Sequence, residues 1–227
     1  MWNVGRIEDG VEMMEAAESK EVQERGAFAV GKAAVLRTRG KGREALEIVQ
    51  TALAARETVG VTSELFREGA IEAIETALAV GDEDAVRSVL AIIDGTPRGK
   101  LPTSLLAQSH RAKGRLALLN GDAAESERLL EEACGLFREL AIPFWLGVTS
   151  LELGECLRGQ GREQEASPLL DEARVNFRAA GRGPLARAGR PPCTGAGDSS
   201  LEVRPVHWRS TYSGVGEAPK DVERRAC

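Results

Sequence analysis

The chain has 227 residues, enough for one or two domains with a substantial buried core. Aromatic residues make up only 4%, which favours helices packed through small and aliphatic side chains over a β-sandwich. The formal charge of −5 divides into −8 over residues 1–180 and +3 over 181–227, and an acidic body argues against direct nucleic-acid binding, which relies on neutralising phosphates.

Targeting and redox signals are absent from the sequence. The amino terminus has no basic region followed by an apolar run, so it is not a secretory signal. No apolar stretch approaches the roughly 20 residues needed to span a bilayer. The four cysteines lack a C-x-x-C spacing. We therefore expect a cytoplasmic protein with reduced thiols and no membrane partner.

The first predicted helix covers residues 7–20. Gly5 and Gly10 each stand 35 residues before their counterparts in the next unit, Gly40 and Ala45. Residues 1–22 are therefore predicted to be the second helix of a repeat whose first helix is missing. A helix pair cannot bury its apolar stripe without its mate. We interpret the chain as a fragment or truncated relative of a longer protein.

Residues 23–181 repeat a helix–turn–helix unit. Small residues recur at steps of 40, 41 and 40, at Ala45, Ala85, Ser126 and Ala166. Apolar residues follow helical spacing on both sides of each turn. The predicted helix pairs are 24–38 with 43–58, 63–79 with 83–94, 103–119 with 123–141, and 144–159 with 163–179. The pattern predicts an all-α solenoid of about four hairpins.

Glycines inside and after the later first helices have a packing reason. Glycine in a helix interior costs about 1 kcal/mol relative to alanine, yet Gly114 and Gly154 repeat 40 residues apart. We expect Gly154 to face Ala166 where two antiparallel helices approach most closely. Gly121 and Gly161 are predicted to end the first helices with positive φ. Pro168 is expected near the first turn of its helix, where a missing N–H costs little.

Catalytic, cofactor and metal chemistry finds no support. GTPRGKL, residues 95–101, is one residue short of a phosphate loop and has leucine where Ser or Thr would hold Mg²⁺, so it is predicted to be a linker. His110 and His207 lack partner ligands or a nucleophile motif. Cys134 and Cys156 are interpreted as small buried hydrophobes. No catalytic, cofactor-binding or metal-ligating residue is predicted.

The remaining functional feature is surface charge. First helices of such a solenoid line its inner, concave side, and outward positions there are predicted for Arg111, Arg115, Glu155 and Arg158, with Arg37 and Glu75 on the same side. Arg111 and Arg115 lie one turn apart, where a peptide carboxylate or acidic segment would meet both. Taken singly, each of these charged residues is better explained as one that keeps the surface soluble. For Phe144 and Trp145 core packing is favoured over ligand binding.

The later units resemble tetratricopeptide repeats (TPR). The resemblance rests on three pairs of residues, namely Gly114 and Gly154, Gly121 and Gly161, and Ala133 and Ala173. The spacing near 40 exceeds the usual 34, and most aromatic and terminal proline positions are missing. More narrowly, residues 137–181 resemble the carboxy-terminal repeats of large bacterial signalling ATPases, which carry a class III cyclase or a LuxR-type DNA-binding domain.

These resemblances imply a non-enzymatic protein–protein interaction scaffold, taken from a signalling or transcription-regulatory ATPase and binding a protein or peptide. The alternatives are a truncated gene remnant without independent activity, or a small helical ligand-binding protein or enzyme. Residues 182–227 hold 5 of the 9 prolines without a sustained apolar period. They are predicted to be a disordered tail or an out-of-frame ending.

Overall fold

The computed structural model of the protein describes residues 21–180. The predicted orphan helix at 7–20 and the predicted tail at 182–227, with His207, lie outside the described residues. Within 21–180 every regular element is helical, as the sequence predicts. The helices are α2 (Val22–Thr38), α3 (Gly42–Ala54), α4 (Arg56–Val59), α5 (Glu64–Val80), α6 (Glu83–Asp94), the 3-10 turn η1 (Arg98–Lys100), α7 (Thr103–Leu119), α8 (Ala123–Glu139), α9 (Pro143–Gly159) and α10 (Glu163–Ala180).

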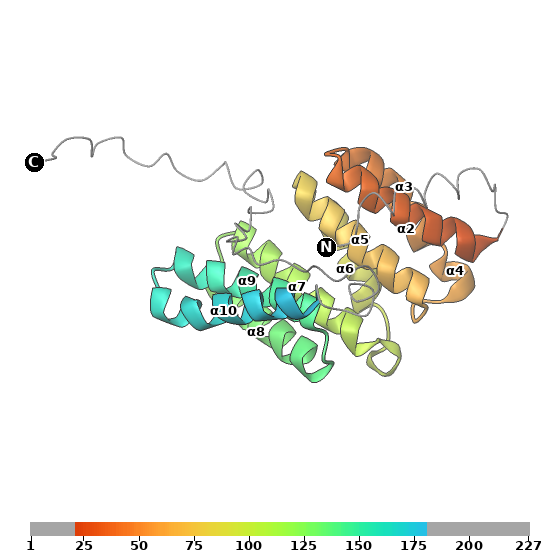
Figure 1. The fold of residues 1–227 in the computed structure, drawn as a ribbon. Coiled ribbons are helices and arrows are strands. Elements are labelled where there is room, and N and C mark those ends of the chain that lie inside the picture. Colours follow the sequence, from red (N-terminus) through yellow and green to blue (C-terminus); the bar gives the residue numbers. More distant parts are fainter. Residues whose placement is uncertain (1–20, 181–227) are drawn as a thin grey trace, which may run out of the picture.

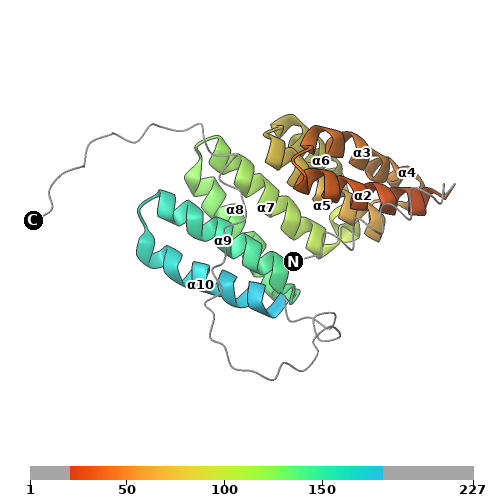
Figure 2. The same ribbon diagram turned by 45° about the horizontal axis from the view of Figure 1, so that its top comes forward.

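The helices pair into four antiparallel hairpins within this range: α2–α3, α5–α6, α7–α8 and α9–α10. The hairpins follow one another along the solenoid, from the red end of the chain to the blue end (Figure 1, Figure 2). The predicted helix pairs are confirmed, with one change: the helix expected over 43–58 ends at Ala54, and the short α4 follows it. None of the helices between 21 and 180 is both long and apolar enough to cross a membrane.

The turns of the two later hairpins use the same backbone conformation. Gly121 and Gly161 have φ of 81° and 78°, in the left-handed region that favours glycine. The next residue then donates its N–H back to the end of the first helix, from Asp122 to Ala117 O at 2.9 Å and from Arg162 to Leu157 O at 3.0 Å. This is the hydrogen bond of a Schellman cap. The predicted turn glycines are confirmed.

The close approach predicted for the later hairpins is present. A Cβ added at Gly154 would lie 2.8 Å from Leu170 Cδ2 and 3.4 Å from Ala166 O. One at Gly114 would lie 2.9 Å from Leu130 Cγ and 3.3 Å from Ser126 O. The same two positions of the facing helix are met in both hairpins. Glycine is therefore needed there because the second helix occupies the space beside it.

The second unit departs from the predicted register. In the third hairpin, Ser126 donates its N–H to the carbonyl oxygen of the capping residue Asp122. In the second hairpin, the residue that makes the same bond, to Asp82, is Val86. Val86 is fully buried while Ala85 is partly exposed. The prediction of Ala85 as the equivalent small residue is therefore wrong by one position. The prediction looked for a small side chain. In the structure, the equivalent residue is the one that stands five positions after the turn glycine in each unit.

The apolar interior divides at α7. One cluster joins α2, α3, α5 and α6 to one side of α7 through Leu105, Ala112 and Leu116. The other joins α8, α9 and α10 to α7 through Ala107. Residues 95–101 connect α6 to α7, follow a helix and contain η1, in keeping with the predicted linker. Pro168 is the sixth residue of α10, one turn further in than expected.

Candidate functional site

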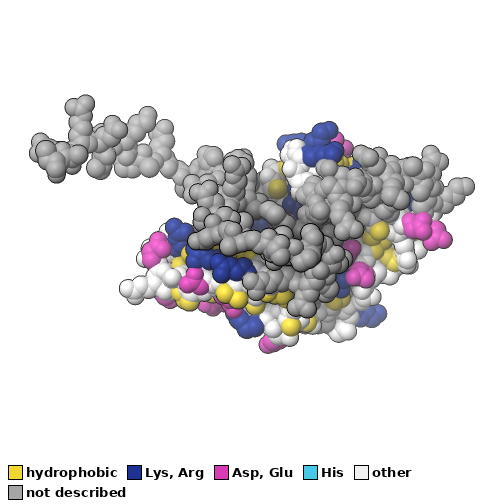
Figure 3. Space-filling model, in the orientation of Figure 1, with side chains coloured by type: hydrophobic (Ala, Val, Ile, Leu, Met, Phe, Trp, Pro, Cys, Tyr) yellow, Lys and Arg dark blue, Asp and Glu magenta, His cyan; other side chains and the backbone are white. Residues whose placement is uncertain are grey.

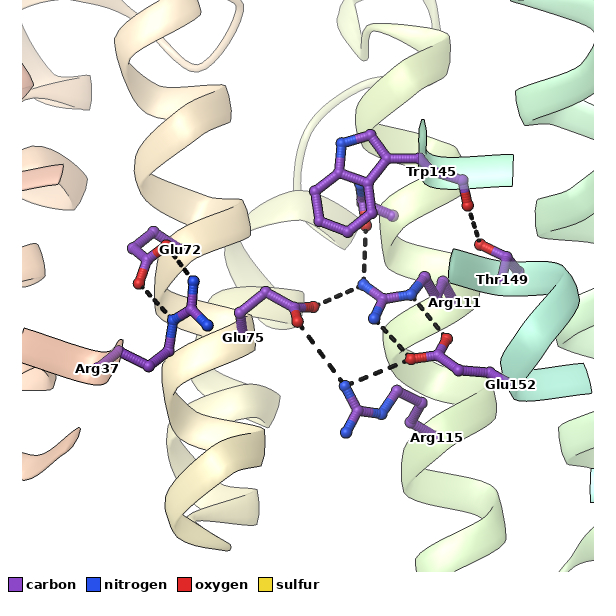
Figure 4. A network of polar contacts seen from close by, with 9 residues as sticks. Arg37, Glu72, Glu75, Arg111, Arg115, Trp145, Thr149 and Glu152 are labelled. Atoms are coloured by element: carbon purple, nitrogen blue, oxygen red, sulfur yellow. Dashed lines mark hydrogen bonds and ion pairs between the residues drawn. The ribbon is translucent and has the colours of Figure 1, made fainter. Parts of the chain in front are cut away.

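Helices α2, α5, α7 and α9 stand side by side and form what we call the first-helix face (Figure 4). Charged residues from all four helices meet there across large distances in sequence. On α2, Arg37 donates to both carboxylate oxygens of Glu72 on α5, at 2.7 and 3.1 Å. One turn further along α5, Glu75 faces α7. The helices of successive units are thus linked by ion pairs along this face.

Arg111 is the centre of the network. Its Nε and Nη2 donate to the two oxygens of Glu152 on α9, at 2.7 and 2.6 Å, and its Nη1 donates to Glu75 Oε1 at 2.6 Å. The guanidinium lies 5.0 Å from the ring centre of Trp145, at cation–π distance. The Arg111 side chain is only 1% exposed. Arg111 therefore links α5 to α9 from a position closed to solvent.

The charges in this network fix its protonation. Burial lowers the pKa of Arg111, but Glu152 and Glu75 outweigh it and raise the pKa above its ordinary value. Burial would raise the pKa of Glu75, but Arg111 and Arg115 outweigh it and hold that pKa below the ordinary value of 4.5. A buried charge is stable only with a partner. These groups therefore stay ionised at neutral pH.

Arg115, one turn beyond Arg111 on α7, is held loosely. Its Nη1 lies 3.5 Å from Glu152 Oε1 and 3.9 Å from Glu75 Oε2, beyond the length of a good charge-assisted hydrogen bond. Its side chain is 21% exposed. Both carboxylates bond Arg111 at short distance instead. Arg115 therefore keeps hydrogen-bond donors that residues 21–180 do not fill.

The structure changes the interpretation of the predicted surface residues. The expected outward position of Arg111 is wrong, because Glu75 and Glu152 from the flanking helices enclose it. Arg115 reaches solvent, Glu155 is partly exposed, and Arg158 is 53% exposed and 3.4 Å from Glu163. As partner-binding residues these four stay predictions. Arg115 combines partial exposure with a place in the network.

Sequence reasoning missed Glu152 and Gln108. Glu152 escaped notice because its partner lies 41 residues away. Gln108 is 3% exposed, and its Oε1 accepts from Arg111 Nη1 at 3.3 Å. Its Nε2 is buried without an acceptor in the described part of the chain. Buried polar groups are normally paired, so this donor requires an explanation.

The other candidate groups, His110, Cys134 and Cys156, are buried or partly buried side chains of the helices. His110 Nδ1 lies 2.9 Å from Glu132, and burial, only partly opposed by that carboxylate, lowers the pKa of the imidazole. Cys134 and Cys156 are buried, and burial raises the pKa of Cys134 to about 11, so its thiol stays protonated. No group of three potential metal ligands occurs between residues 21 and 180.

The aromatic residues of α9 divide between core and surface. Trp145 packs against the second apolar cluster and stacks on Phe137, with ring centres 6.5 Å apart. Phe144 is 39% exposed and contacts Phe177 edge-on. Core packing is thus observed for Trp145, and Phe144 stays at the surface.

Comparison with known proteins identifies the fold. No family model matches the chain, and no curated protein sequence matches it. Among solved structures, a Rap protein in complex with competence and sporulation factor superposes with a TM-score of 0.60 at 13% identity, over 77% of this chain and 50% of that one. BtubC (BKLC) from P. vanneervenii gives 0.52 at 16% identity, over 86% of this chain and 77% of that one.

A third solved structure is a single-substitution variant of the TPR-like repeats of a putative kinesin light chain from P. anserina. It gives a TM-score of 0.50 at 21% identity, over 79% of this chain and 90% of that one. The fold is a TPR-like α-solenoid. The chain spans about half the length of the Rap protein. At these identities the likeness extends to the fold alone.

Proposed function

We propose that the protein is a non-enzymatic scaffold that binds an extended segment of a protein partner on the first-helix face. The observation that carries the proposal is the charged network on that face, where helices from separate hairpins hold Glu75, Arg115 and Glu152 at fixed positions. A surface of fixed charges on a rigid frame recognises its partner by charge and shape complementarity. The Rap neighbour, solved with its competence and sporulation factor, supports an interaction role for this fold.

The charge distribution elsewhere supports the choice of this face. In the view of Figure 3 acidic and basic side chains both appear over the described helices. Several charged side chains pair within one helix, as Arg128 does with Glu125 and Glu132 on α8. Such pairs are exposed to solvent and contribute little to the stability of the fold. Pairs between hairpins also occur away from this face, as between Arg162 and Glu127, but on the first-helix face one side chain, Arg111, bonds both neighbouring hairpins at once.

The experiment selects ligands from a random peptide library displayed on phage, using the full chain immobilised through its amino terminus. Selected peptides are then measured against Arg115→Gln and against Arg128→Gln, a matched loss of one arginine from α8. Arg115→Gln should weaken binding about tenfold or more, the usual effect of losing one charge-assisted hydrogen bond, and Arg128→Gln should leave it unchanged. Failure to select any peptide, or equal binding to both variants, overturns the proposal. Arg111 is unsuitable as a probe, because we expect its removal to destabilise the fold as well.

We further propose that the chain corresponds to the repeat segment of a larger bacterial signalling or transcription-regulatory ATPase. The support is the resemblance of residues 137–181 to the carboxy-terminal repeats of such proteins. The test is the genomic neighbourhood: an adjacent in-frame region encoding an ATPase module supports the proposal, and an unrelated complete gene on both sides overturns it.

A further inference from the structure

The helix α10 repeats α8, but no helix of residues 21–180 packs on its outer side (Figure 2). In α8, four residues at helical spacing contact the hairpin that follows. They are Glu127 with Arg162 at 2.6 Å, Leu130 in the apolar cluster shared with α9, Cys134 with Ser150 at 3.8 Å, and Phe137 with Trp145. Their equivalents 40 residues later are Ser167, Leu170, Arg174 and Phe177.

The equivalent apolar side chains differ in burial. Phe137 is 0% exposed under Trp145, whereas Phe177 is 36% exposed. Leu130 is buried, and Leu170 is partly exposed. A helix that packed on α10 as α9 packs on α8 would bury both Leu170 and Phe177. The outer side of α10 thus has the apolar residues of a helix contact.

The charges along this side are divided between its two ends. Alternate steps of four and three residues, the spacing of a helix-pairing seam, join Glu163, Ser167, Leu170, Arg174 and Phe177, which we call the α10 stripe. The stripe begins with an exposed carboxylate at Glu163. It ends with two exposed guanidinium groups, because Arg178 follows Phe177.

The basic end lacks a carboxylate from another helix. Arg178 forms no ion pair or hydrogen bond through its side chain within residues 21–180. Arg174 pairs only with Asp171 of its own helix. Arg174 and Arg178 are four residues apart, so their like charges repel each other. A carboxylate placed between them would relieve this repulsion.

A second copy of α10 supplies that carboxylate. When two such helices run antiparallel with their Leu170 side chains in contact, each residue before position 170 lies opposite one equally far after it. Glu163, seven residues before, then lies opposite Phe177 and between Arg174 and Arg178 of the second copy. Two-fold symmetry repeats this contact at the other end. The antiparallel arrangement also pairs opposite ends of the helix dipoles.

We propose that two copies of the chain form a dimer by packing their α10 stripes against each other as an antiparallel helix pair. Leu170 and Phe177 provide the apolar contact, and Glu163 of each copy pairs with Arg174 and Arg178 of the other. The dimer uses the outer side of the last hairpin and leaves the first-helix face open. This inference therefore goes beyond the proposed function and does not depend on it.

The mass of the full chain in solution tests the dimer. Sedimentation equilibrium should give twice the 24.3 kDa of one chain at concentrations above about 10 μM, the range of a modest interface. The dimer should dissociate more readily as NaCl rises from about 0.05 to 0.5 M, because salt screens the end pairs. A monomer up to about 0.1 mM, as expected if another protein or another segment of this chain covers the stripe, overturns the proposal.

Matched variants identify the surface. Phe177→Ser should weaken the dimer at least tenfold, because it removes the largest apolar side chain of the stripe. Val175→Ser is the control, since Val175 is more exposed than Phe177 but lies off the stripe, and it should leave the dimer unchanged. Circular dichroism checks that both variants fold. Equal effects of the two substitutions, or a dimer that persists in Phe177→Ser, overturn the proposal.

A charge exchange tests the antiparallel pairing. Glu163→Lys alone, or Arg174→Glu combined with Arg178→Glu, sets like charges against each other at both ends and should weaken the dimer at least tenfold. An equimolar mixture of these two variants should form a mixed dimer, because every end contact is then again between opposite charges. Failure of the mixture to associate overturns the proposed pairing. The peptide selection on the first-helix face is decided separately from all these outcomes.

Discussion

The α5–α6 and α9–α10 hairpins have the same turn and the same buried position after it, yet they pack differently. In α9–α10, Gly154 faces Ala166 and Leu170 so closely that a Cβ would reach Leu170. In α5–α6, counting back equally from the turn glycine places Ile74 where Gly154 stands, and Val86 takes the place of Ala166. The two helices of α5–α6 contact each other much less than those of α9–α10.

The difference shows that the turn defines the hairpin while the side chains set the distance between its helices. Ile74 and Val86 are both buried in the first apolar cluster. The side chains of Ile74 and Val86 lie between α5 and α6, at the positions where Gly154 and Ala166 let the backbones of α9 and α10 approach each other. The solenoid therefore tolerates a wider hairpin in one unit because large side chains fill the gap, and the later units have closer backbones.

The largest loss of stability should come from replacing Arg111, which bonds Glu75 of α5 and Glu152 of α9. Arg111→Met should lower the free energy of unfolding by about 3 kcal/mol or more, because Glu75 and Glu152 would lose their closest cation in a largely buried place. Urea unfolding of the full chain, followed by circular dichroism, measures it. The control Arg128→Met removes an arginine that is 53% exposed and should cost under about 1 kcal/mol. Equal losses would mean that the network does not stabilise the stack.

The close approach in α9–α10 is tested by Gly154→Val. Overpacking against Leu170 should cost about 1–3 kcal/mol. Gly135 in α8 is the matched control, because a Cβ added there meets nothing within 4 Å. Gly135→Val should change the stability by about 0.5 kcal/mol or less. A similar result for both variants would contradict the packing role assigned to Gly154.

The equivalent buried position should respond with opposite signs in two hairpins. Val86→Ala leaves a small cavity in the wide hairpin and should destabilise by about 1–2 kcal/mol. Ser126→Ala removes a buried hydroxyl that has no partner among the described residues, so it should be neutral or stabilise by up to about 1 kcal/mol. Thermal unfolding of both variants measures the two changes. Destabilisation by both would show that Ser126 makes a contact of its own.

The smallest change in stability is expected from protonation of Glu75 at acid pH. Since the pKa of Glu75 is lower in the folded protein than its ordinary value of 4.5, its contribution is complete above 4.5 and is lost as the pH falls through the folded pKa. Stability, measured by urea unfolding at a series of pH values, should therefore fall below pH 4.5, and Glu75→Gln should make this fall less steep. An unchanged slope in Glu75→Gln would mean that other carboxylates cause the acid unfolding.

The predictions that held were those that depend on local pattern. Helix pairs, turn glycines and the closeness of Gly154 to Ala166 follow from apolar spacing and from small residues at steps near 40. The search for small residues failed at Ala85, because a shift of one residue leaves the helical pattern almost unchanged while only packing distinguishes Ala85 from Val86. Arg111 was predicted to point outward for a related reason: a charge on a helix is usually solvated unless another helix covers it.

By itself, the sequence determined the all-α solenoid of hairpins, because turns and helices within a unit depend on residues near one another in the chain. Only the tertiary structure decided which charges are exposed on the first-helix face. Burial of Arg111 requires Glu75 and Glu152, which lie 36 and 41 residues away on neighbouring helices. Pairing over such separations leaves no periodic signal, since it arises when complete hairpins stack.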